Sequence, residues 1–247
     1  KEVYYMNNID LIDLHSHSIA SVHAYSTLKE NIDAAKVKGL KYYGLSDHGP
    51  GMKNTTLPNF FHNFRVIPRN WGELHFLAVI ELNIMDYHGK IDLDTNTLKK
   101  LDYALASLHL NCLKPGTKEE NTNAYLGAIA NPFVKIIAHP DDARYIFDSE
   151  PIIAAAKQHH VLIEVNNASL APNATRPGAW ELDTLNLKYC EQYGVPVIVN
   201  SDAHFYTDIG NHQYAFSLLK KLSFPNELIV NYNEELIKEY FYSADKF

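Results

Sequence analysis

Histidine is the residue type in this sequence that most clearly indicates chemistry: 13 of the 247 residues are histidines, against 22 lysines and arginines together. Histidine is the commonest metal ligand in proteins and exchanges protons near neutral pH. Two motifs, His15-Ser16-His17 and Asp202-Ala203-His204, each place two possible ligands at positions i and i+2. In extended backbone this spacing turns both side chains to the same face. Each motif therefore predicts two ligands that share one metal ion or hold two neighbouring ions.

A larger set of similar residues extends this prediction to a whole metal centre. One His-x-His pair arises easily by chance, but imidazole and carboxylate groups recur along the chain. The candidate ligands are His15, His17, His23, His48, Glu81, His109, His139, Asp202 and His204. A catalytic zinc ion takes about three protein ligands and keeps one position open, so this set fits about three divalent ions. Imidazole with carboxylate suits zinc, which we expect, and also manganese or iron.

Short β-rich runs precede most of these residues and must position them. The predicted strands are residues 9–14, 40–45, 75–82, 103–108, 134–138, 161–165 and 195–199. Most of their positions are apolar, as in parallel strands that are buried on both faces. Helical patterns follow at residues 27–38, 122–130, 152–159, 181–193, 213–222 and 233–241. This alternation predicts an α/β fold of parallel βαβ units, and seven strands favour closure into a barrel.

The candidate ligands lie at or just after the carboxyl ends of the predicted strands. In parallel barrels, residues from different strands converge at this rim to form the active site. The sequence therefore predicts a metal centre at the carboxyl-terminal rim. Two stretches, 49–71 and 110–121, are predicted to be loop-rich insertions. Because no linker or internal repeat divides the chain, we expect one domain over residues 1–247.

At these positions the sequence resembles the PHP (polymerase and histidinol phosphatase) superfamily, and within it most closely the YcdX-like phosphatases. The motifs that carry the resemblance are Asp13-Leu14-His15-Ser16-His17, His23-Ala24-Tyr25-Ser26, Ser46-Asp47-His48-Gly49, Glu81-Leu82-Asn83, His109, Ala138-His139-Pro140, Glu164-Val165-Asn166-Asn167 and Ser201-Asp202-Ala203-His204. They run in order from about residue 10 to residue 205. Two parts depart from the pattern: Ser107 and Leu108 precede His109 where relatives often carry glycine, and residues 170–180 match only loosely.

The resemblance implies a distorted (β/α)7 barrel, similar to a TIM barrel, with a trinuclear zinc centre and phosphoesterase activity. Bound ions lower the pKa of water, so a metal-bound hydroxide is expected to attack the phosphorus of a small phosphate monoester. Asp13, Asp47 and Glu164 are expected to orient the ligating imidazoles or waters. Arg176, with Arg65 and Arg69 as alternatives, is the candidate group for holding the substrate phosphate.

Composition limits the partners. The formal net charge is −7 with neutral histidine, so there is no cationic excess to neutralise nucleic-acid phosphates, and we expect no nucleic-acid partner. Three divalent ions would make the rim locally cationic and able to accept a small phosphate ester. No apolar run reaches the roughly 18 residues of a membrane span.

The cellular location is inferred from two further features. Cys112 and Cys190 are far apart in the sequence, which favours reduced thiols and a cytoplasmic protein. Residues 1–8 do not form a basic region followed by an apolar stretch, so we expect no secretory signal. The chain begins at Lys1, which leaves open what preceded it.

Three other functions compete with a general phosphatase. Histidinol-phosphate phosphatase has the same chemistry with one defined substrate. An amidohydrolase-type metal hydrolase also uses His-x-His at the first strand, but usually has a metal-bridging lysine at the fourth strand, where this chain has His109. A non-catalytic metal-binding module would be expected to have lost some of the ligands that this chain keeps.

Overall fold

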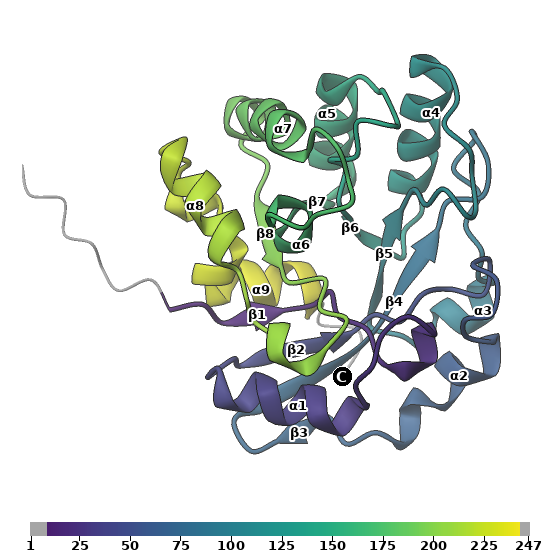
Figure 1. Cartoon of the computed structure of the whole chain (residues 1–247), viewed down its shortest axis with the longest axis vertical. Helices are drawn as coiled ribbons and strands as arrows, with labels where there is room; N and C mark the ends of the chain where they lie inside the picture. The colour runs from purple at the N-terminus through teal and green to yellow at the C-terminus, as the bar shows by residue number, and fades with distance from the viewer. Residues whose placement is uncertain (1–8, 243–247) are drawn as a thin grey trace, which may run out of the picture.

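The computed structural model describes residues 9–242, which form a parallel sheet nearly closed into a barrel (Figure 1). The parallel strands are β1 (Ile12–Asp13), β2 (Tyr42–Leu45), β4 (Leu74–Asn83), β5 (Tyr103–Ser107), β6 (Val134–Ile137), β7 (Leu162–Asn166) and β8 (Val197–Asn200). They lie side by side in chain order. Within the described residues, each predicted strand is present. The predicted α/β fold, a distorted seven-stranded barrel, is confirmed.

Each strand is buried on both faces, and alternate side chains enter two different cores. In β4, Leu77 and Val79 belong to a cluster inside the barrel, whereas Phe76 and Ala78 pack towards the surrounding helices. This two-residue alternation is the pleat of a β-strand. Because both faces are apolar, the strands read as near-continuous hydrophobic runs, and this explains why they were recognisable in the sequence.

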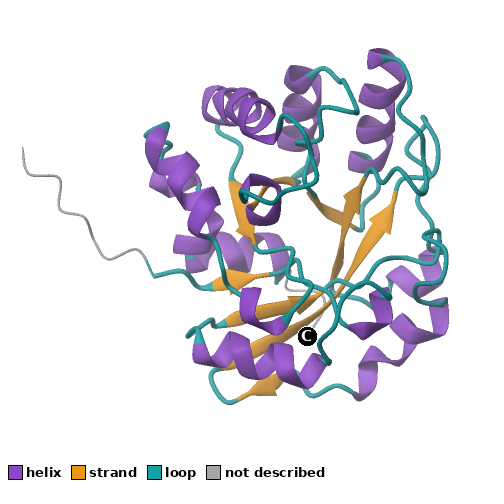
Figure 2. Ribbon diagram, viewed as in Figure 1, coloured by secondary structure: helices purple, strands orange, loops and turns teal. Residues whose placement is uncertain are grey.

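Helices surround the sheet, as Figure 2 shows in purple around the orange strands. They are α1 (Leu28–Val37), α2 (Pro58–His62), α3 (Thr95–Leu98), α4 (Lys118–Ile129), α5 (Ser149–His159), α6 (Asn167–Leu170), α7 (Ala179–Tyr193), α8 (Gln213–Lys221) and α9 (Glu234–Phe241). Single 3-10 turns occur at Ile19–Ser21, Asn63–Val66, Tyr206–Asp208, Asn226–Leu228 and Val230–Tyr232. Helix α9 covers the amino end of the barrel, where the ring centre of Phe241 lies 4.5 Å from that of Tyr103.

The structure differs from the sequence prediction in the two stretches expected to be loops. Residues 49–71 contain α2 and the short strand β3 (Asn70–Trp71), which pairs antiparallel with β4. Helix α4 begins at Lys118, four residues before the predicted start. Its start is fixed by a capping box, in which the Thr117 side chain accepts from the Glu120 N–H and the Glu120 carboxylate accepts from the Thr117 N–H. Helices α3 and α6 were not predicted, because four residues are too few to show a helical period.

The barrel closes between β1 and β8 through a narrow seam. Past the strand ends, Ser16 and Ala203 form an isolated parallel bridge, and the His17 N–H donates to the Ala203 carbonyl (2.8 Å). The buried side chain of Asn231 connects β1 to β8. Its Nδ2 donates to the carbonyls of Ile12 (3.0 Å) and Val199 (2.9 Å), and its Oδ1 accepts from the Val199 N–H (2.8 Å). An amide side chain thus replaces part of the missing strand ladder.

Among residues 9–242, no helix is both long and apolar enough to cross a membrane. The expectation about a secretory signal concerns residues 1–8, which lie outside the described residues.

Candidate metal centre

The pleat of the strands turns the predicted ligands into the barrel. In β4, Glu81 continues the inward face of Leu77 and Val79 at the carboxyl end of the strand. His109 likewise continues the inward face of Tyr103 and Leu105 of β5, and it lies four residues beyond Leu105. Side chains that alternate along neighbouring parallel strands therefore meet above the inner core.

Glu81 is the centre of the site. Its carboxylate is fully buried and lies among five imidazoles from four other parts of the chain. Its Oε2 lies 2.6 Å from His48 Nδ1 and 3.7 Å from His17 Nε2, and its Oε1 lies 2.8 Å from His139 Nε2, 3.2 Å from His109 Nε2 and 3.5 Å from His15 Nε2. One carboxylate thus connects the ends of β1, β2, β5 and β6, which is the position expected of a bridging ligand.

Asp202 is the second buried carboxylate among these imidazoles. Its Oδ1 lies 3.2 Å from His17 Nε2 and 3.6 Å from His15 Nε2. The backbone of Asp202 is left-handed, with a φ of 53°. Few residues other than glycine adopt this conformation, and aspartate is among those that do so most readily. The turn after β8 therefore places the Asp202 side chain beside the predicted ligands that follow β1.

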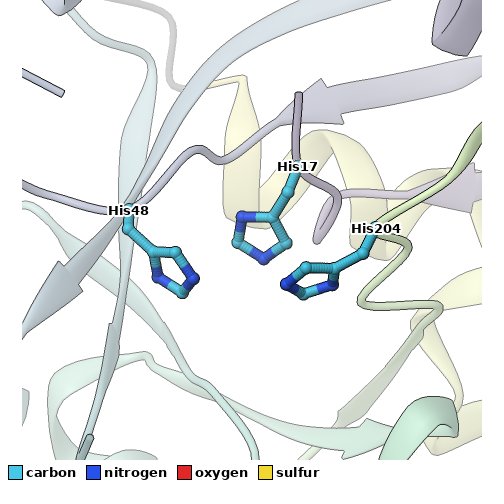
Figure 3. Close-up of side chains that lie close together, drawn as sticks. All are labelled: His17, His48 and His204. Carbon is cyan, nitrogen blue, oxygen red and sulfur yellow. The ribbon is translucent and has the colours of Figure 1, made fainter. Parts of the chain in front are cut away.

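Imidazoles dominate the open side of the site. Figure 3 shows His17, His48 and His204 with their rings turned towards a common space. The ring centre of His17 lies 4.4 Å from those of both His48 and His204. His23, which is exposed, joins them from the loop after β1: its Nε2 lies 3.4 Å from His48 Nε2. The nine predicted ligands are therefore neighbours on one rim.

The donor set fits bound cations. Four overlapping triads have ligand atoms within 4.8 Å of one another: His17, His48 and His204; His15, His17 and Asp202; His15, Glu81 and His139; and His48, Glu81 and His109. Inside these groups, His15 Nε2 and Glu81 Oε2 are buried without a hydrogen bond. An unsatisfied buried polar atom costs about 1–3 kcal/mol, and metal coordination would remove this cost.

The carboxylates and imidazoles perturb one another's proton affinity. Burial alone would raise the pKa of Glu81, but His48, His109 and His15 hold it well below its usual range. Burial, together with His48 and His204, lowers the pKa of His17 well below its usual value. Burial also lowers the pKa of His109 to about 4, despite the opposite effect of Glu81. A deprotonated carboxylate beside neutral imidazoles is the protonation state in which these groups bind metal ions.

Glu164 supports two of the predicted ligands at once. Its Oε1 lies 2.8 Å from His15 Nδ1, and its Oε2 accepts from the backbone N–H of His139 (2.8 Å). Asn200 and Asn166 donate their side-chain amides to the same carboxylate, at 2.8 and 3.0 Å. Because all four partners donate, the carboxylate is fixed and leaves His15 Nε2 directed towards Glu81 and Asp202.

Asp47 and Asp13, the other two predicted supporting residues, bind loops. Asp47 accepts from the Ser21 hydroxyl (2.6 Å), and Ser21 Oγ in turn lies 3.3 Å from His17 Nδ1. Asp13 accepts from the N–H (3.1 Å) and hydroxyl (2.5 Å) of Ser201, directly before Asp202. Asp47 therefore reaches the ring of the predicted ligand His17 through one hydroxyl, whereas Asp13 positions the backbone that carries the predicted ligand Asp202.

The three arginines considered for phosphate binding lie in different surroundings. Arg176 lies beside the site: both terminal nitrogens lie 3.2 Å from Asp202 Oδ2, and one donates to Ser169 Oγ (2.8 Å). Arg65 is exposed on the 3-10 turn between β2 and β4. Arg69 donates to Asp102 (2.6 Å), just before β5, at the opposite end of that strand from His109.

Two asparagines belong to the site although the sequence analysis gave them no role. Asn83 Oδ1 lies 2.7 Å from His109 Nδ1, and Asn200 binds Glu164 as described. Asn83 had a visible signal, because it follows Glu81 by two residues and so continues the inward face of β4. Asn200 continues the inward face of Ile198 in the same way.

Family profiles and a curated relative match this chain over most of its length. The PHP domain profile matches residues 13–172, and the PHP-associated profile matches residues 184–220. A protein of Clostridium novyi named as a probable phosphatase is 39% identical over 236 residues, which covers 96% of each chain.

Two solved structures share the fold at low sequence identity. Histidinol phosphate phosphatase from Lactococcus lactis, solved with zinc, L-histidinol and phosphate, is 15% identical, with a TM-score of 0.60 over 87% of this chain and 95% of that one. A chain of an archaeal ribonuclease P with mature tRNA is 17% identical, with a TM-score of 0.58 over 93% of this chain and 89% of that one. At these identities the likeness concerns the fold alone. The profile match and the curated relative show that the chain belongs to the PHP domain family.

Proposed function

We propose that this protein is a metal-dependent phosphatase that hydrolyses small phosphate monoesters with three divalent ions, zinc being the expected metal. The observation that carries the proposal is the set of four overlapping ligand triads on one rim. Its relatives support the reaction class, since curated proteins about 39–40% identical over almost the whole chain are named probable phosphatases. We propose that the PHP domain covers residues 1–247 and that its metal centre lies on the carboxyl-terminal rim.

The number of ions follows from the number of ligands. Nine candidate side chains at about three per ion correspond to three ions. Glu81 belongs to two of the four triads, and its two carboxylate oxygens suit a ligand that two neighbouring ions share. The zinc in the Lactococcus lactis structure belongs to that protein, and it supports zinc here as the first metal to test.

Bound ions would lower the pKa of a water molecule towards neutrality, so that hydroxide is available as a nucleophile, and would offset charge on the phosphoryl oxygens. Side chains of the protein supply the negative charge of the site and orient the imidazoles. Glu81 and Asp202 supply negative charge at the floor of the site, and Glu164 fixes the ring of His15. His23 and His204 lie on the open side, where a substrate would enter.

Arg176 is our candidate for the phosphate-binding group. Its guanidinium is held at the site by Asp202 and Ser169, and part of the side chain remains accessible. A guanidinium can bind two oxygens of a phosphate at once. The contact with Asp202 gives Arg176 a second role, because it fixes the carboxylate oxygen that does not face His17.

The expected partner is a small molecule rather than a nucleic acid, and the net charge of −7 supports this. The ribonuclease P neighbour makes RNA an outcome to test. The free thiols of Cys112 and Cys190 support a cytoplasmic location.

The test combines metal analysis of the purified protein with a panel of phosphate monoesters that includes histidinol phosphate, and with an RNA substrate. We expect two or more tightly bound ions per chain and metal-dependent release of phosphate from several esters. The variant His15→Ala should lose activity while keeping a wild-type circular dichroism spectrum. Fewer than two tightly bound ions, or hydrolysis unchanged in His15→Ala, would contradict the proposal.

A further inference from the structure

A partly buried carboxylate outside the predicted ligand set, Asp92, connects two of the site's loops. It lies between β4 and α3, just after a short hairpin in which Ile84 and Ile91 form an antiparallel bridge. In the same hairpin the Met85 N–H donates to the Lys90 carbonyl (2.7 Å). The hairpin brings Asp92 back against the end of β4, beside Asn83.

Asp92 and Asn83 make a two-point contact. Asp92 Oδ1 accepts from the Asn83 backbone N–H (2.9 Å), and Asp92 Oδ2 accepts from Asn83 Nδ2 (2.6 Å). Asn83 Nδ2 also donates to the carbonyl of Gly49 (3.2 Å). A carboxylate and a carbonyl are both acceptors, so the NH2 group of Asn83 must face them. The orientation of the amide is therefore determined by its neighbours.

The orientation of the Asn83 amide determines which nitrogen of His109 carries the proton. Asn83 Oδ1 lies 2.7 Å from His109 Nδ1, and a carbonyl oxygen can only accept. His109 therefore carries its proton on Nδ1, and the lone pair of Nε2 faces Glu81, 3.2 Å away. A neutral imidazole binds a metal through its unprotonated nitrogen, and a hydrogen bond at the other nitrogen selects which one that is.

The same carboxylate also holds the loop after His48. Asp92 Oδ2 accepts from the Gly51 N–H (2.8 Å). The contact is close: a Cβ on Gly49 would lie 2.4 Å from Asp92 Oδ2, so a side chain there would displace the carboxylate. Asp92 is thus linked to both histidines of the triad His48, Glu81 and His109.

We infer that Asp92 is a positioning residue for this triad, acting through Asn83 on His109 and through the residue 49–51 loop on His48. The inference rests on the proposed function only in that the triad binds a metal ion. Asp92 touches neither the ion nor the substrate, and it determines the affinity of the triad for metal.

The test measures zinc binding to the apoprotein by competition with a chromophoric chelator. In Asp92→Asn, an NH2 group replaces one carboxylate oxygen and faces at least one of the N–H donors from Asn83 or Gly51. Because two donors cannot bind each other, we expect this variant to weaken binding of one ion per chain by about 10–100-fold. Asp94→Asn is the matched control: Asp94 caps α3 from an exposed position, and asparagine caps equally well. This control should keep wild-type affinity.

A double-mutant cycle tests whether Asp92 acts through Asn83. If it does, Asp92→Ala should have a smaller effect on zinc affinity in the Asn83→Ala background than in the wild-type chain, the remaining effect being that of the residue 49–51 loop on His48. Additive effects, or wild-type affinity in Asp92→Asn, would overturn the inference. If Asp92→Asn fails to fold, Asn83→Ser provides the same measurement, with weaker zinc binding expected and unchanged binding contradicting the inference. Absence of zinc binding by the wild-type chain would instead overturn the proposed function, and the inference with it.

Discussion

Glu164 Oε1 lies 2.8 Å from Nδ1 of His15, with both side chains completely buried. The pair joins the middle of β7 to the second residue after β1, on the opposite side of the β1–β8 seam. Burial by itself would lower the pKa of His15, but Glu164, Asp202 and Glu81 raise it well above its usual value. Before any cation binds, this imidazole therefore offsets part of the buried negative charge, together with Arg176 beside Asp202.

Glu164→Gln should weaken metal binding and activity together. All four groups that contact the Glu164 carboxylate, described above, are hydrogen-bond donors, so an NH2 group in its place would face a donor and release His15 or His139. We expect a loss of about 10–100-fold in kcat/KM for a phosphate ester, with reduced metal content. Glu119→Gln, an exposed residue of α4, is the control and should behave as wild type. Wild-type metal content in Glu164→Gln would argue against this role.

Removal of metal should lower the thermal stability of the protein. Ions that bind only the folded state stabilise it by about 4 kcal/mol when their concentration is 1,000 times Kd. For a chain of this length we expect Tm to fall by roughly 8–16 °C in a chelator. The measurement is a thermal melt before and after dialysis against chelator, followed by addition of zinc. An unchanged Tm would show that the ligand cluster does not hold ions tightly.

A buried histidine outside the site should make stability depend on pH. His212 Nδ1 lies 2.5 Å from Asp10 Oδ2, and although burial opposes it, this carboxylate, with Asp13, raises the pKa of His212 to about 10. A raised pKa stabilises the folded state fully below the unfolded value of about 6.5, and this stabilisation is lost as pH rises towards 10.

The check is urea unfolding of the metal-free protein at pH 6 and pH 10.5. The wild-type chain should lose on the order of 3 kcal/mol more than His212→Asn between these two pH values. His88→Gln, at an exposed loop position, should retain the wild-type pH dependence. Equal pH dependence in His212→Asn and wild type would show that His212 is not charged in the folded protein.

Asn231→Ala should destabilise the barrel at its seam. The change removes the partners of the Val199 N–H and of two buried carbonyls, those of Ile12 and Val199. Unsatisfied buried groups cost about 1–3 kcal/mol each, so we expect the free energy of unfolding to fall by about 3–5 kcal/mol. Urea unfolding measures this loss, with the exposed Asn226→Ala as a neutral control. A loss below about 1 kcal/mol would mean that water replaces the amide.

Much of the fold could be predicted from the sequence because the relevant signals are local. A buried parallel strand is an apolar run, and each of the seven runs became a strand. The start of α4 was wrong by four residues although its capping box was present in the sequence, since Thr117 and Glu120 lie in a stretch that otherwise reads as loop. The antiparallel strand β3 is two residues long and has no pattern of its own.

The candidate ligands could be named from the sequence because each lies at or beyond the carboxyl end of a strand, and these ends of parallel strands lie on one rim. Their roles as metal ligands stay a prediction. What the sequence could not provide is the network that orients them. The connection of Asp92 to Asn83 depends on a hairpin that returns the chain to β4, and that of Glu164 to His15 spans 149 positions.

The sequence by itself therefore determined the type of fold, the family and the residues that gather at the rim, because strand period and position relative to a strand end are properties of short segments. Only the tertiary structure decided which nitrogen of each imidazole faces the centre, which side chains orient those imidazoles, and how Asn231 closes the barrel. These depend on distances between groups far apart in the chain, which are set by packing of the whole barrel and leave no periodic pattern in the sequence.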